Sequence, residues 1–392
     1  MKQGWEIKKL GEVCTIERGG SPRPIQAYIT ESDDGINWIK IGDATDGSKY
    51  ITSTKEKIKP EGMKKSRFVH KGDFILSNSM SFGRPYILAV DGCIHDGWLV
   101  IHDDNNRFDK NYLYYYLGSP NIYNEFKRLA VGGVVNNLNS ELVRSVNVCI
   151  PPREEQERIV EELDCLSGVI ERKREQLKEL DALAQSIFYQ MFGDPITNEK
   201  GWEVKKVKDV FNVKIGPFGS LLHNSDYISG GTPLVNPIHM QNEKICPDFD
   251  FSVSDEKLKE LDSYLLQTND IIFARRGDIG RCAIVGKDEN GYLCGTGSLF
   301  IRPIQSVCSV FMLKSFRCKS MVEHLTSLAK GATMLNINCK IIEELNIIMP
   351  SLTLQQEFAD KIEAIEKQKE LIKQSITQTE ELFNSRMDYY FK

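Results

Sequence analysis

The chain contains one series of short motifs twice, and this repeat constrains its fold more than any other feature of the sequence. The segment Gly4-Trp5-Glu6-Ile7-Lys8-Lys9-Leu10 returns as Gly201-Trp202-Glu203-Val204-Lys205-Lys206-Val207. Further pairs follow in the same order, at offsets of 197 and then 199 residues: Asp73 and Asp270, Gly83-Arg84 and Gly280-Arg281, Gly132 and Gly331, Asn137 and Asn336, Pro151 and Pro350, Gln156 and Gln355. Such a period is too long for a solenoid, so the pattern indicates a tandem duplication of one unit.

Each unit begins with about 150 residues of mixed character. Short β-rich runs, such as 38–41 and 74–76, alternate with turns rich in Gly, Asn, Asp and Pro, and residues 112–117 and 321–328 are typical of short helices. The sequence therefore predicts an α+β fold, with mixed α/β domains over 1–152 and 193–351.

A long helix is predicted after each mixed domain, over 153–192 and 352–392. Apolar residues recur at alternating steps of four and three, which specifies a supercoiled helix of about 58 Å. The predicted seam is Ile159, Leu163, Leu166, Ile170, Lys173, Leu177, Leu180, Ala184, Ile187 and Met191, followed 199 residues later by Phe358, Ile362, Ile365, Lys369, Ile372, Ile376, Thr379, Phe383, Arg386 and Tyr390. Lys173 and Lys369 interrupt the seam and can set its register.

The composition predicts an intracellular globular protein. Hydrophobic residues make up 41% of the 392 residues and charged residues 27%, and no apolar run approaches the length of a membrane span. The first residues lack the apolar core of a secretion signal. Ten cysteines occur without a Cys-x-x-Cys pair, which favours a reduced cytoplasm over a zinc ribbon or a disulfide scaffold.

No motif for catalysis is present. The chain lacks the Gly-x-x-x-x-Gly-Lys-Ser/Thr loop, His-Glu-x-x-His, and the Asp/Asn-Pro-Pro-Tyr motif that holds the amine in amino-methyltransferases. The six histidines are dispersed, and His95-Asp96 and His102-Asp103 are interpreted as ordinary loop pairs. We therefore expect no catalytic residue, no metal site and no cofactor in this chain.

Local groups of cations favour contact with a polyanion, although the net charge is −5. Seven cations lie between Lys55 and Lys71 against two acidic residues. Arg275-Arg276 and Arg281 flank two glycines, and Arg can read guanine while Lys contacts phosphate. The candidate DNA-binding residues are Arg23, Lys64, Lys65, Arg67, Arg84, Asn137, Arg275, Arg276, Arg281, Lys330, Thr333 and Asn336. For the arginines the alternative is a solvated face or a salt bridge to Asp73, Asp270 or Asp278, and for Asn137 and Asn336 it is a local turn cap.

The assembled motifs resemble the specificity (S) subunit of type I restriction–modification systems over almost the whole chain. The resemblance rests on the duplicated Gly-Trp-Glu start, on the segments 37–43 and 269–281, on Pro151-Pro152-x-Glu-Glu155-Gln156-x-Arg158-Ile159, and on Met191-Phe192-Gly193-Asp194-Pro195. It implies two target recognition domains separated by two long helices that pack as an antiparallel coiled coil.

The resemblance also implies partners. They are double-stranded DNA, two adenine-N6 methyltransferase (M) subunits that use S-adenosylmethionine, and restriction (R) subunits that use ATP and Mg²⁺; the S subunit itself catalyses nothing. The helix starts, with Glu155, Gln156 and Gln355, are expected to contact the partners. Leu354 stands where an acidic counterpart of Glu155 would lie, so the two contacts are not expected to be identical.

The segments between the paired positions differ between the units, as 77–80 differ from 274–277. This difference predicts two unlike half-sites and an asymmetric DNA target. Two other hypotheses remain open at this point: a coiled-coil scaffold with two protein-binding domains, favoured by the acidic isoelectric point, and an autonomous DNA enzyme with an unrecognised site.

Overall fold

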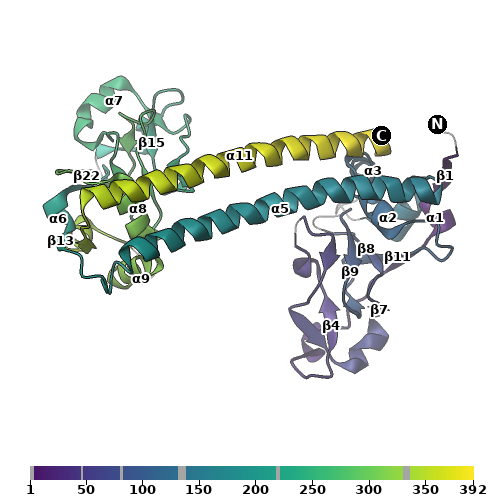
Figure 1. The fold of residues 1–392 in the computed structure, drawn as a ribbon. Coiled ribbons are helices and arrows are strands. Elements are labelled where there is room, and N and C mark those ends of the chain that lie inside the picture. The colour runs from purple at the N-terminus through teal and green to yellow at the C-terminus, as the bar shows by residue number, and fades with distance from the viewer. Residues whose placement is uncertain (1–3, 46, 80–82, 131–137, 218–220, 330–335) are drawn as a thin grey trace. The chain divides into compact units, whose positions relative to one another are not determined.

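The computed structural model describes residues 4–45, 47–79, 83–130, 138–217, 221–329 and 336–392. The chain divides into two compact units: unit 1 is Met1–Lys173 with Gln374–Lys392, and unit 2 is Arg174–Lys373. Each unit combines a mixed α/β part with pieces of two long helices (Figure 1). These are α5 (Arg153–Phe192) and α11 (Leu352–Phe391), each of 40 residues, and both run from one unit into the other. The predicted fold class is therefore confirmed.

The strands in the described part of unit 1 form three sheets, ordered β1-β12, β3-β6-β4-β10-β7 and β2-β11-β8-β9-β5. Their bounds are β1 (Glu6–Lys9), β2 (Thr15–Arg18), β3 (Ile29–Thr30), β4 (Ile36–Ile39), β5 (Tyr50–Ile51), β6 (Glu56–Ile58), β7 (Arg67–Val69), β8 (Phe74–Ser77), β9 (Pro85–Leu88), β10 (Gly92–Ile94), β11 (Trp98–His102) and β12 (Asn147–Ile150).

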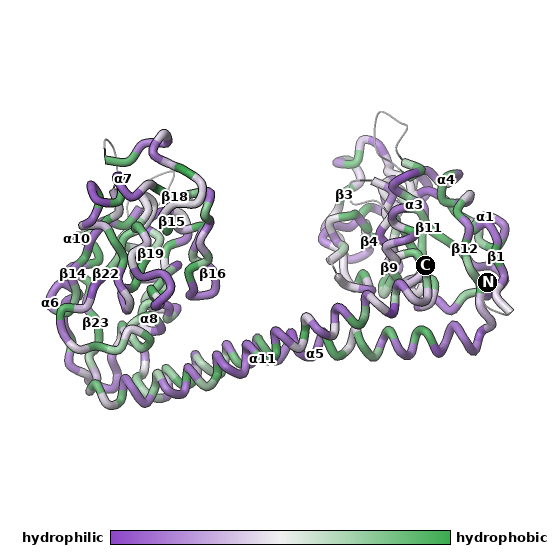
Figure 2. The backbone as a smooth tube through the Cα atoms, turned by 90° about the horizontal axis from the view of Figure 1, so that it is seen from above, coloured by the Kyte–Doolittle hydropathy of each residue, from purple (hydrophilic) through white to green (hydrophobic). Residues whose placement is uncertain are grey.

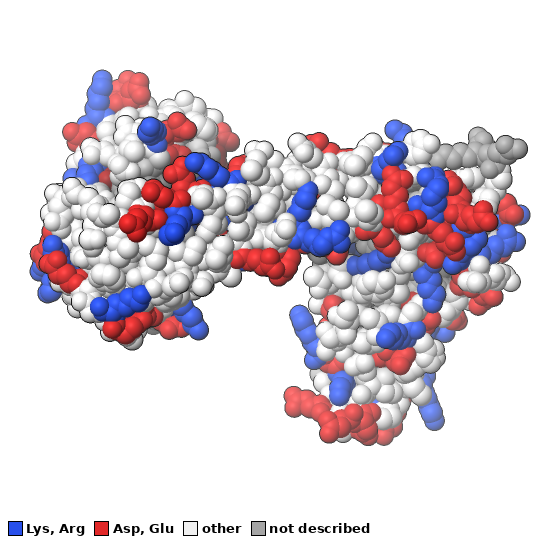
Figure 3. Space-filling model, viewed as in Figure 1, with Lys and Arg blue, Asp and Glu red and all other residues white. Residues whose placement is uncertain are grey.

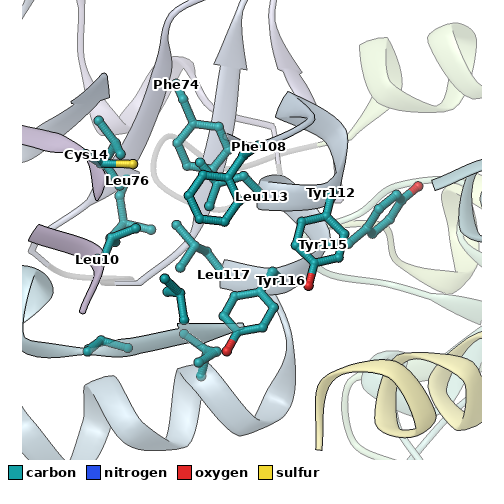
Figure 4. Packing of buried hydrophobic residues seen from close by; sticks show 14 of the residues in the cluster. Leu10, Cys14, Phe74, Leu76, Phe108, Tyr112, Leu113, Tyr115, Tyr116 and Leu117 are labelled. Atoms are coloured by element: carbon teal, nitrogen blue, oxygen red, sulfur yellow. The ribbon is translucent and has the colours of Figure 1, made fainter. Parts of the chain in front are cut away.

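The helices of unit 1 cover the sheet that contains β8. They are α1 (Leu10–Val13), α2 (Lys110–Leu117), α3 (Pro120–Ala130) and α4 (Ser140–Ser145), with the 3₁₀ turns η1 (Ile25–Ala27), η2 (Ile41–Asp43) and η3 (Pro60–Lys65). The Asp109 carboxylate caps α2 by accepting from the backbone N–H groups of Asn111 and Tyr112. Tyr112 and its neighbours on α2 are buried against the sheet residues Phe74 and Leu76 (Figure 4). This packing fixes the sheet against the helices.

Among the residues of unit 2 that the structure describes, the strands form four sheets, ordered β13-β23, β14-β22-β19-β20, β18-β15-β21 and β16-β17. Their bounds are β13 (Val204–Lys206), β14 (Phe211–Ile215), β15 (Thr232–Val235), β16 (Met240–Gln241), β17 (Lys244–Ile245), β18 (Ser252–Val253), β19 (Ile271–Ala274), β20 (Cys282–Ile284), β21 (Leu293–Cys294), β22 (Ser298–Pro303) and β23 (Asn346–Ile348). The helices are α6 (Val207–Val210), α7 (Asp255–Glu260), α8 (Ser309–Arg317), α9 (Lys319–Leu328) and α10 (Cys339–Glu343), with η5 (Asn224–Asp226), η6 (Pro237–His239) and η7 (Asp262–Tyr264).

The two units repeat the same strand register, as a duplication requires. In unit 1 Leu76 of β8 lies opposite Leu99 of β11, and in unit 2 Phe273 of β19 lies opposite Leu299 of β22. The parallel pair β4 and β10 likewise has its counterpart in β15 and β21. The corresponding residues are apolar and buried in both units, so the sequence repeat preserves the core of each sheet.

The long helices pack antiparallel along the predicted seam. In unit 1 Arg386 of α11 pairs with Glu162 of α5, and further along α5 Lys173 donates to Ser375. In unit 2 Lys369 lies 2.7 Å from Asp181. Every predicted seam residue is buried or half-buried. Hydrophilic and hydrophobic residues alternate along both helices, as expected when one face of each helix packs against the other helix (Figure 2).

The sequence seam misses the most buried residues near the end of α5. Phe188 and Phe192 are 1% and 0% exposed, although the predicted seam positions there are Ile187 and Met191. Both phenylalanines contact Phe311 of α8 and Phe358 of α11. The most buried positions near the end of α5 are therefore shifted by one residue from the predicted seam. The reason is that α8 covers a second side of α5 there.

Candidate nucleic-acid interface

A shared backbone arrangement joins three segments at one end of β8 in unit 1. Here the N–H of Ser77 donates to the carbonyl of Arg84 at 3.0 Å. The N–H of Asn78 donates to Gly97 at 2.9 Å, and the carbonyl of Asn78 accepts from Leu138 at 3.0 Å. We call these five residues the tip of unit 1. The tip brings together the β8–β9 turn, the turn before β11 and the segment before α4.

Unit 2 has the same arrangement at the end of β19. The N–H of Ala274 donates to Arg281 at 2.8 Å, the N–H of Arg275 to Gly297 at 3.1 Å, and the N–H of Ile337 to Arg275 at 2.9 Å. We call these five residues the tip of unit 2. The two tips have one backbone plan, but Asn78 occupies the position of Arg275, and both side chains are buried. The next residue differs in charge and in exposure, because unit 2 has an exposed Arg276 where unit 1 has the half-buried Ser79.

Arg275 and Asn336, both predicted to bind DNA, contact each other at the tip of unit 2. The guanidinium Nε of Arg275 donates to Oδ1 of Asn336 at 3.3 Å, and Arg275 is only 8% exposed. Burial, and then the neighbouring charge of Arg276, lower the pKa of Arg275. Arg275 therefore supports the tip from inside, whereas Arg276 is exposed beside it.

Two further candidate arginines have partners inside their own unit. Arg281 donates to the carboxylate of Asp278 at 2.9 Å and to the carbonyl of Pro237 at 3.1 Å. The salt bridge that the sequence left as an alternative is thus formed for Arg281. Arg84 is exposed and close to Tyr86, where its charge partly offsets the rise in the pKa of Tyr86 that burial causes.

Arg23 lies on a loop that packs beside η3. The N–H of Gly20 and the hydroxyl of Ser66 both donate to the carbonyl of Ile94, at 3.1 Å each, which holds the loop against the start of β7. The side chain of Arg23 is 82% exposed and lies 3.6 Å from a carboxylate oxygen of Asp96. Arg23 is therefore accessible to a polyanion and only loosely held.

The lysines and the arginine predicted around η3 lie close to this loop. Lys65 donates to the phenol oxygen of Tyr28 at 2.7 Å, and Arg67 lies 2.8 Å from Glu17. Lys64 is exposed and makes no ion pair with any residue that the structure describes. The structure thus gathers Arg23, Lys64, Lys65 and Arg67 on one part of unit 1. Anionic groups are interspersed among the cations on the visible face of each unit (Figure 3).

The remaining DNA-binding candidates, Asn137, Lys330 and Thr333, lie outside the described residues. Their neighbours Leu138 and Asn336 belong to, or contact, the tips described above. Whether any of the predicted residues contacts DNA stays a prediction.

The glutamines predicted to contact partner subunits are used inside their own units. Gln156, which is 1% exposed, accepts from the N–H of Asp109 at 2.7 Å and donates to the carbonyls of Arg107 and Pro151 at 2.9 Å each. Gln355, also 1% exposed, makes the equivalent bonds to Cys308 and Pro350 in unit 2. Sequence reasoning missed this internal role.

Glu155 is half-buried at the start of α5 and binds Arg158, with carboxylate-to-guanidinium distances of 2.8 Å. The hydrogen bonds to Glu155 raise the pKa of Arg158. A contact of Glu155, Gln156 or Gln355 with a partner stays a prediction.

Asp96 connects several parts of the tip region in unit 1, a role that the sequence did not reveal. Its carboxylate accepts from the hydroxyl of Ser21 at 2.7 Å, which lowers the pKa of Asp96. Its carbonyl accepts from Arg18 at 2.9 Å and from the amide of Asn78 at 3.0 Å. Ser21 is 75 positions from Asp96, so no local motif could have shown their contact.

The described residues include thiols and side chains of metal-ligating type. They contain no group of three or more His, Cys, Asp and Glu side chains placed to hold a metal ion. Burial raises the pKa of Cys14 and of Cys282 to about 12, which keeps both thiols protonated and unreactive. None of the helices in the described part of the chain is long and apolar enough to cross a membrane.

Curated relatives align with nearly all of the chain. The MjaIX specificity subunit of a type I restriction enzyme from Methanocaldococcus jannaschii is 23% identical over 385 residues, which cover 92% of this chain and 86% of the relative. The EcoBI specificity subunit from Escherichia coli is 20% identical over 92% of this chain and 79% of its own length.

Solved structures share the fold. A chain in a structure of the type I R-M system matches with a TM-score of 0.65 at 18% identity, covering 100% of this chain and 98% of that one. The type I restriction–modification S subunit from M. genitalium matches with a TM-score of 0.52 at 14% identity, covering 98% and 95%. The family model for the type I restriction modification DNA specificity domain matches residues 2–182 and 199–381. With both of its units matched, the chain belongs to the family of type I restriction–modification DNA specificity proteins.

Proposed function

We propose that the chain is the non-catalytic subunit that selects the DNA target of a type I restriction–modification complex, and that each unit contacts one half of a bipartite target. One observation carries the proposal: the two tips share a backbone arrangement, but the residue beside each tip differs, since unit 2 has an exposed Arg276 where unit 1 has Ser79. A shared backbone arrangement with different side chains suits two domains that recognise different DNA sequences. Base edges are read by side chains, while the frame only positions them. The target is therefore asymmetric.

The proposed partners supply the chemistry. Two methyltransferase subunits, using S-adenosylmethionine, methylate N6 of adenine at the selected site, and restriction subunits that use ATP and Mg²⁺ complete the complex. The methyltransferase has to flip the target adenine into its own pocket, because an atom inside a stacked duplex is out of reach. The proposed location is the cytoplasm, where the host DNA lies.

The proposed role of α5 and α11 is to set the unread spacer between the half-sites. Both helices continue from one unit into the other, so a change in their length acts on both units at once. Inserting one heptad into each helix, at the junction of the units, is expected to change the spacer length without changing either half-site.

A gel-shift experiment with and without the methyltransferase partners tests the proposal. We expect a shift that needs the partners and that a specific competitor removes far better than a random one, with a steep salt dependence. A coiled-coil scaffold without a DNA role gives no sequence-selective shift, and that outcome would refute the proposal.

Mapping methylated adenines in the host, with and without the gene, gives an independent test. We expect one bipartite asymmetric motif that disappears on deletion. Purified chain alone, incubated with DNA and labelled S-adenosylmethionine or with Mg²⁺ and ATP, is expected to leave the DNA unmodified and uncut. Turnover by the chain alone would support an autonomous enzyme instead.

A further inference from the structure

A pocket of about 790 Å³ lies next to the tip of unit 1, between the loop that carries Arg23 and the strand β4. Its walls include Arg23, Trp38, Lys40, Glu56 and His95. Lys40 and Glu56 form an ion pair with each other, so each largely satisfies the other's charge. Among the other lining residues, Arg23, His95 and the exposed Gln26 carry side-chain N–H groups that can donate hydrogen bonds to an incoming molecule.

A hydrogen bond to the ring of His95 indicates which of its two nitrogens carries the hydrogen. The backbone N–H of Gly97 donates to Nδ1 of His95 at 2.7 Å. A neutral imidazole carries one N–H and one bare nitrogen, so the hydrogen of this ring lies on Nε2. The backbone N–H of His95 donates to Ile39 at 3.2 Å, and the ring meets Trp38 edge-on at a centroid distance of 6.2 Å. These contacts hold the ring of His95 in place and leave Nε2–H as its one side-chain donor.

Arg23 supplies a second donor group at the same pocket. Its side chain is 82% exposed, and its ion-pair partner among the described residues is Asp96, at 3.6 Å. It can therefore turn to an acceptor on a ligand at little cost, since exposed ion pairs are weak. The Ser21 hydroxyl keeps Asp96 in place during this exchange, because its bond to the carboxylate is independent of Arg23.

The pocket does not suit a stacked, flipped-out base. Trp38 is 2% exposed, so its ring face is not available for stacking. The pocket instead offers N–H groups that can donate hydrogen bonds to the edge of a base. In the major groove guanine presents two adjacent acceptors, N7 and O6, whereas cytosine presents an amine donor.

We propose that this pocket reads one guanine in the half-site contacted by unit 1, with the Nε2–H of His95 and the guanidinium of Arg23 donating to its two acceptors. The inference rests on the proposed function and extends it to a specificity-determining pair of residues.

In the described part of unit 2, the positions equivalent to His95 and Trp38 carry other residues. A side chain on Gly19 would meet the carbonyl of His95 at 2.2 Å, and one on Gly216 would meet the carbonyl of Gly295 at 2.0 Å, so Gly295 corresponds to His95. The strand pairing likewise places Leu234 where unit 1 has Trp38. The guanine contact therefore belongs to unit 1 alone and contributes to the asymmetry of the target.

Substitution of His95 in the full chain, assembled with its methyltransferase partners, tests the proposal. The motif of the wild-type complex is first mapped, and competitor duplexes with each base of both half-sites replaced are then titrated in gel shifts. The wild type is expected to prefer guanine at one position of the unit 1 half-site by about 10- to 100-fold. His95→Leu and Arg23→Met are each expected to remove most of that preference at this position only.

His95→Gln keeps an N–H donor near the place of Nε2 and is expected to retain part of the preference. His70→Leu is the matched control. His70 is exposed in the turn that precedes β8, at the end of this strand away from the tip, so its substitution is expected to leave the motif unchanged. If His95→Leu fails to fold, as judged by thermal unfolding, Arg23→Met and His95→Gln still decide the question.

The outcomes are distinct. Absence of any sequence-selective binding by the wild type overturns the proposed function, and this inference with it. A selective wild type with folded variants that keep the guanine preference, or that lose selectivity equally in both half-sites, overturns this inference alone.

Discussion

The ammonium group of Lys49 lies 2.7 Å from a carboxylate oxygen of Asp164, and this ion pair joins the mixed part of unit 1 to α5. The same oxygen accepts from the hydroxyl of Tyr115 at 2.5 Å, and the Lys49 ammonium lies 4.9 Å from the centroid of the Tyr115 ring. Lys49 immediately precedes β5, at the edge of the sheet that carries β8 and the tip. The contact therefore helps to fix the tip of unit 1 relative to its own part of α5.

Replacing Lys49 by methionine is expected to lower the free energy of unfolding by about 1–2 kcal/mol. The loss is moderate because Asp164 is 43% exposed and keeps the hydrogen bond from Tyr115. Urea unfolding followed by circular dichroism measures it. Lys178→Met is the control: its pair with Glu175 is largely exposed, so a change below about 0.5 kcal/mol is expected. Equal effects of the two substitutions would contradict a special role for Lys49.

The buried amide of Gln156 is expected to matter for stability even when no partner is present. Gln156→Leu leaves three backbone groups without their hydrogen bonds and is expected to cost about 2–4 kcal/mol. The unfolding midpoint of the chain alone measures this effect. Gln356→Leu, at an exposed position on α11, should change the midpoint little. A stable Gln156→Leu chain that no longer binds its partners would instead assign Gln156 to the partner contact.

Arg276 is expected to contribute to DNA binding from the tip of unit 2. Arg276→Met should weaken the specific complex by about 1–3 kcal/mol if Arg276 reads a base, with selectivity lost at one position of one half-site. A phosphate contact would instead weaken binding to all sequences and reduce the salt slope by about one. Gel shifts at several salt concentrations separate these results. Lys287→Met is the control. It also removes one positive charge, but Lys287 is exposed beyond the end of β20 away from the tip, so the affinity for DNA should stay nearly unchanged.

Glu344 is expected to titrate far below other glutamates. Hydrogen bonds from Lys206 and Lys208, and then their charges, lower its pKa from 4.5 to about 2. A carboxylate with a depressed pKa in the folded state stabilises the protein above its unfolded pKa, and this contribution fades as the pH falls toward 2. NMR titration of the side chain measures the value. Lys208→Met should raise the pKa toward 4.5, and high salt should raise it too, since the group is exposed. A wild-type value near 4.5 would show that the pairs do not persist in solution.

The sequence predicted those parts of the fold that depend on local periodicity. The heptad pattern identified both long helices, and the seam residues Ile159 and Tyr390 are both buried as expected. The pattern failed at Phe188, since its burial depends on α8, an element more than a hundred residues away. Periodicity within a helix cannot show a second covered side.

Candidate site residues were harder to place from sequence, because their roles depend on partners distant in the chain. The motif that contains Arg275 and Arg281 marked the tip of unit 2, but not that Arg275 is buried against Asn336 while Arg276 is exposed. The dipeptide His95-Asp96 was interpreted as an ordinary loop pair, although Asp96 binds Ser21 and the His95 ring is fixed by Gly97. Gln156 belongs to the motif on which the family resemblance rests. Its side chain also makes buried hydrogen bonds, which only the structure reveals.

Unit 1 is discontinuous, since it consists of Met1–Lys173 together with Gln374–Lys392, whereas unit 2 is the uninterrupted stretch between them. On the ribosome, unit 2 can complete its contacts as soon as it has emerged. The first unit to be synthesised must wait for Met387, Tyr390 and Phe391 before its core is closed. During translation the earlier-made domain is thus the later one to mature, and its apolar face stays open until these residues have emerged.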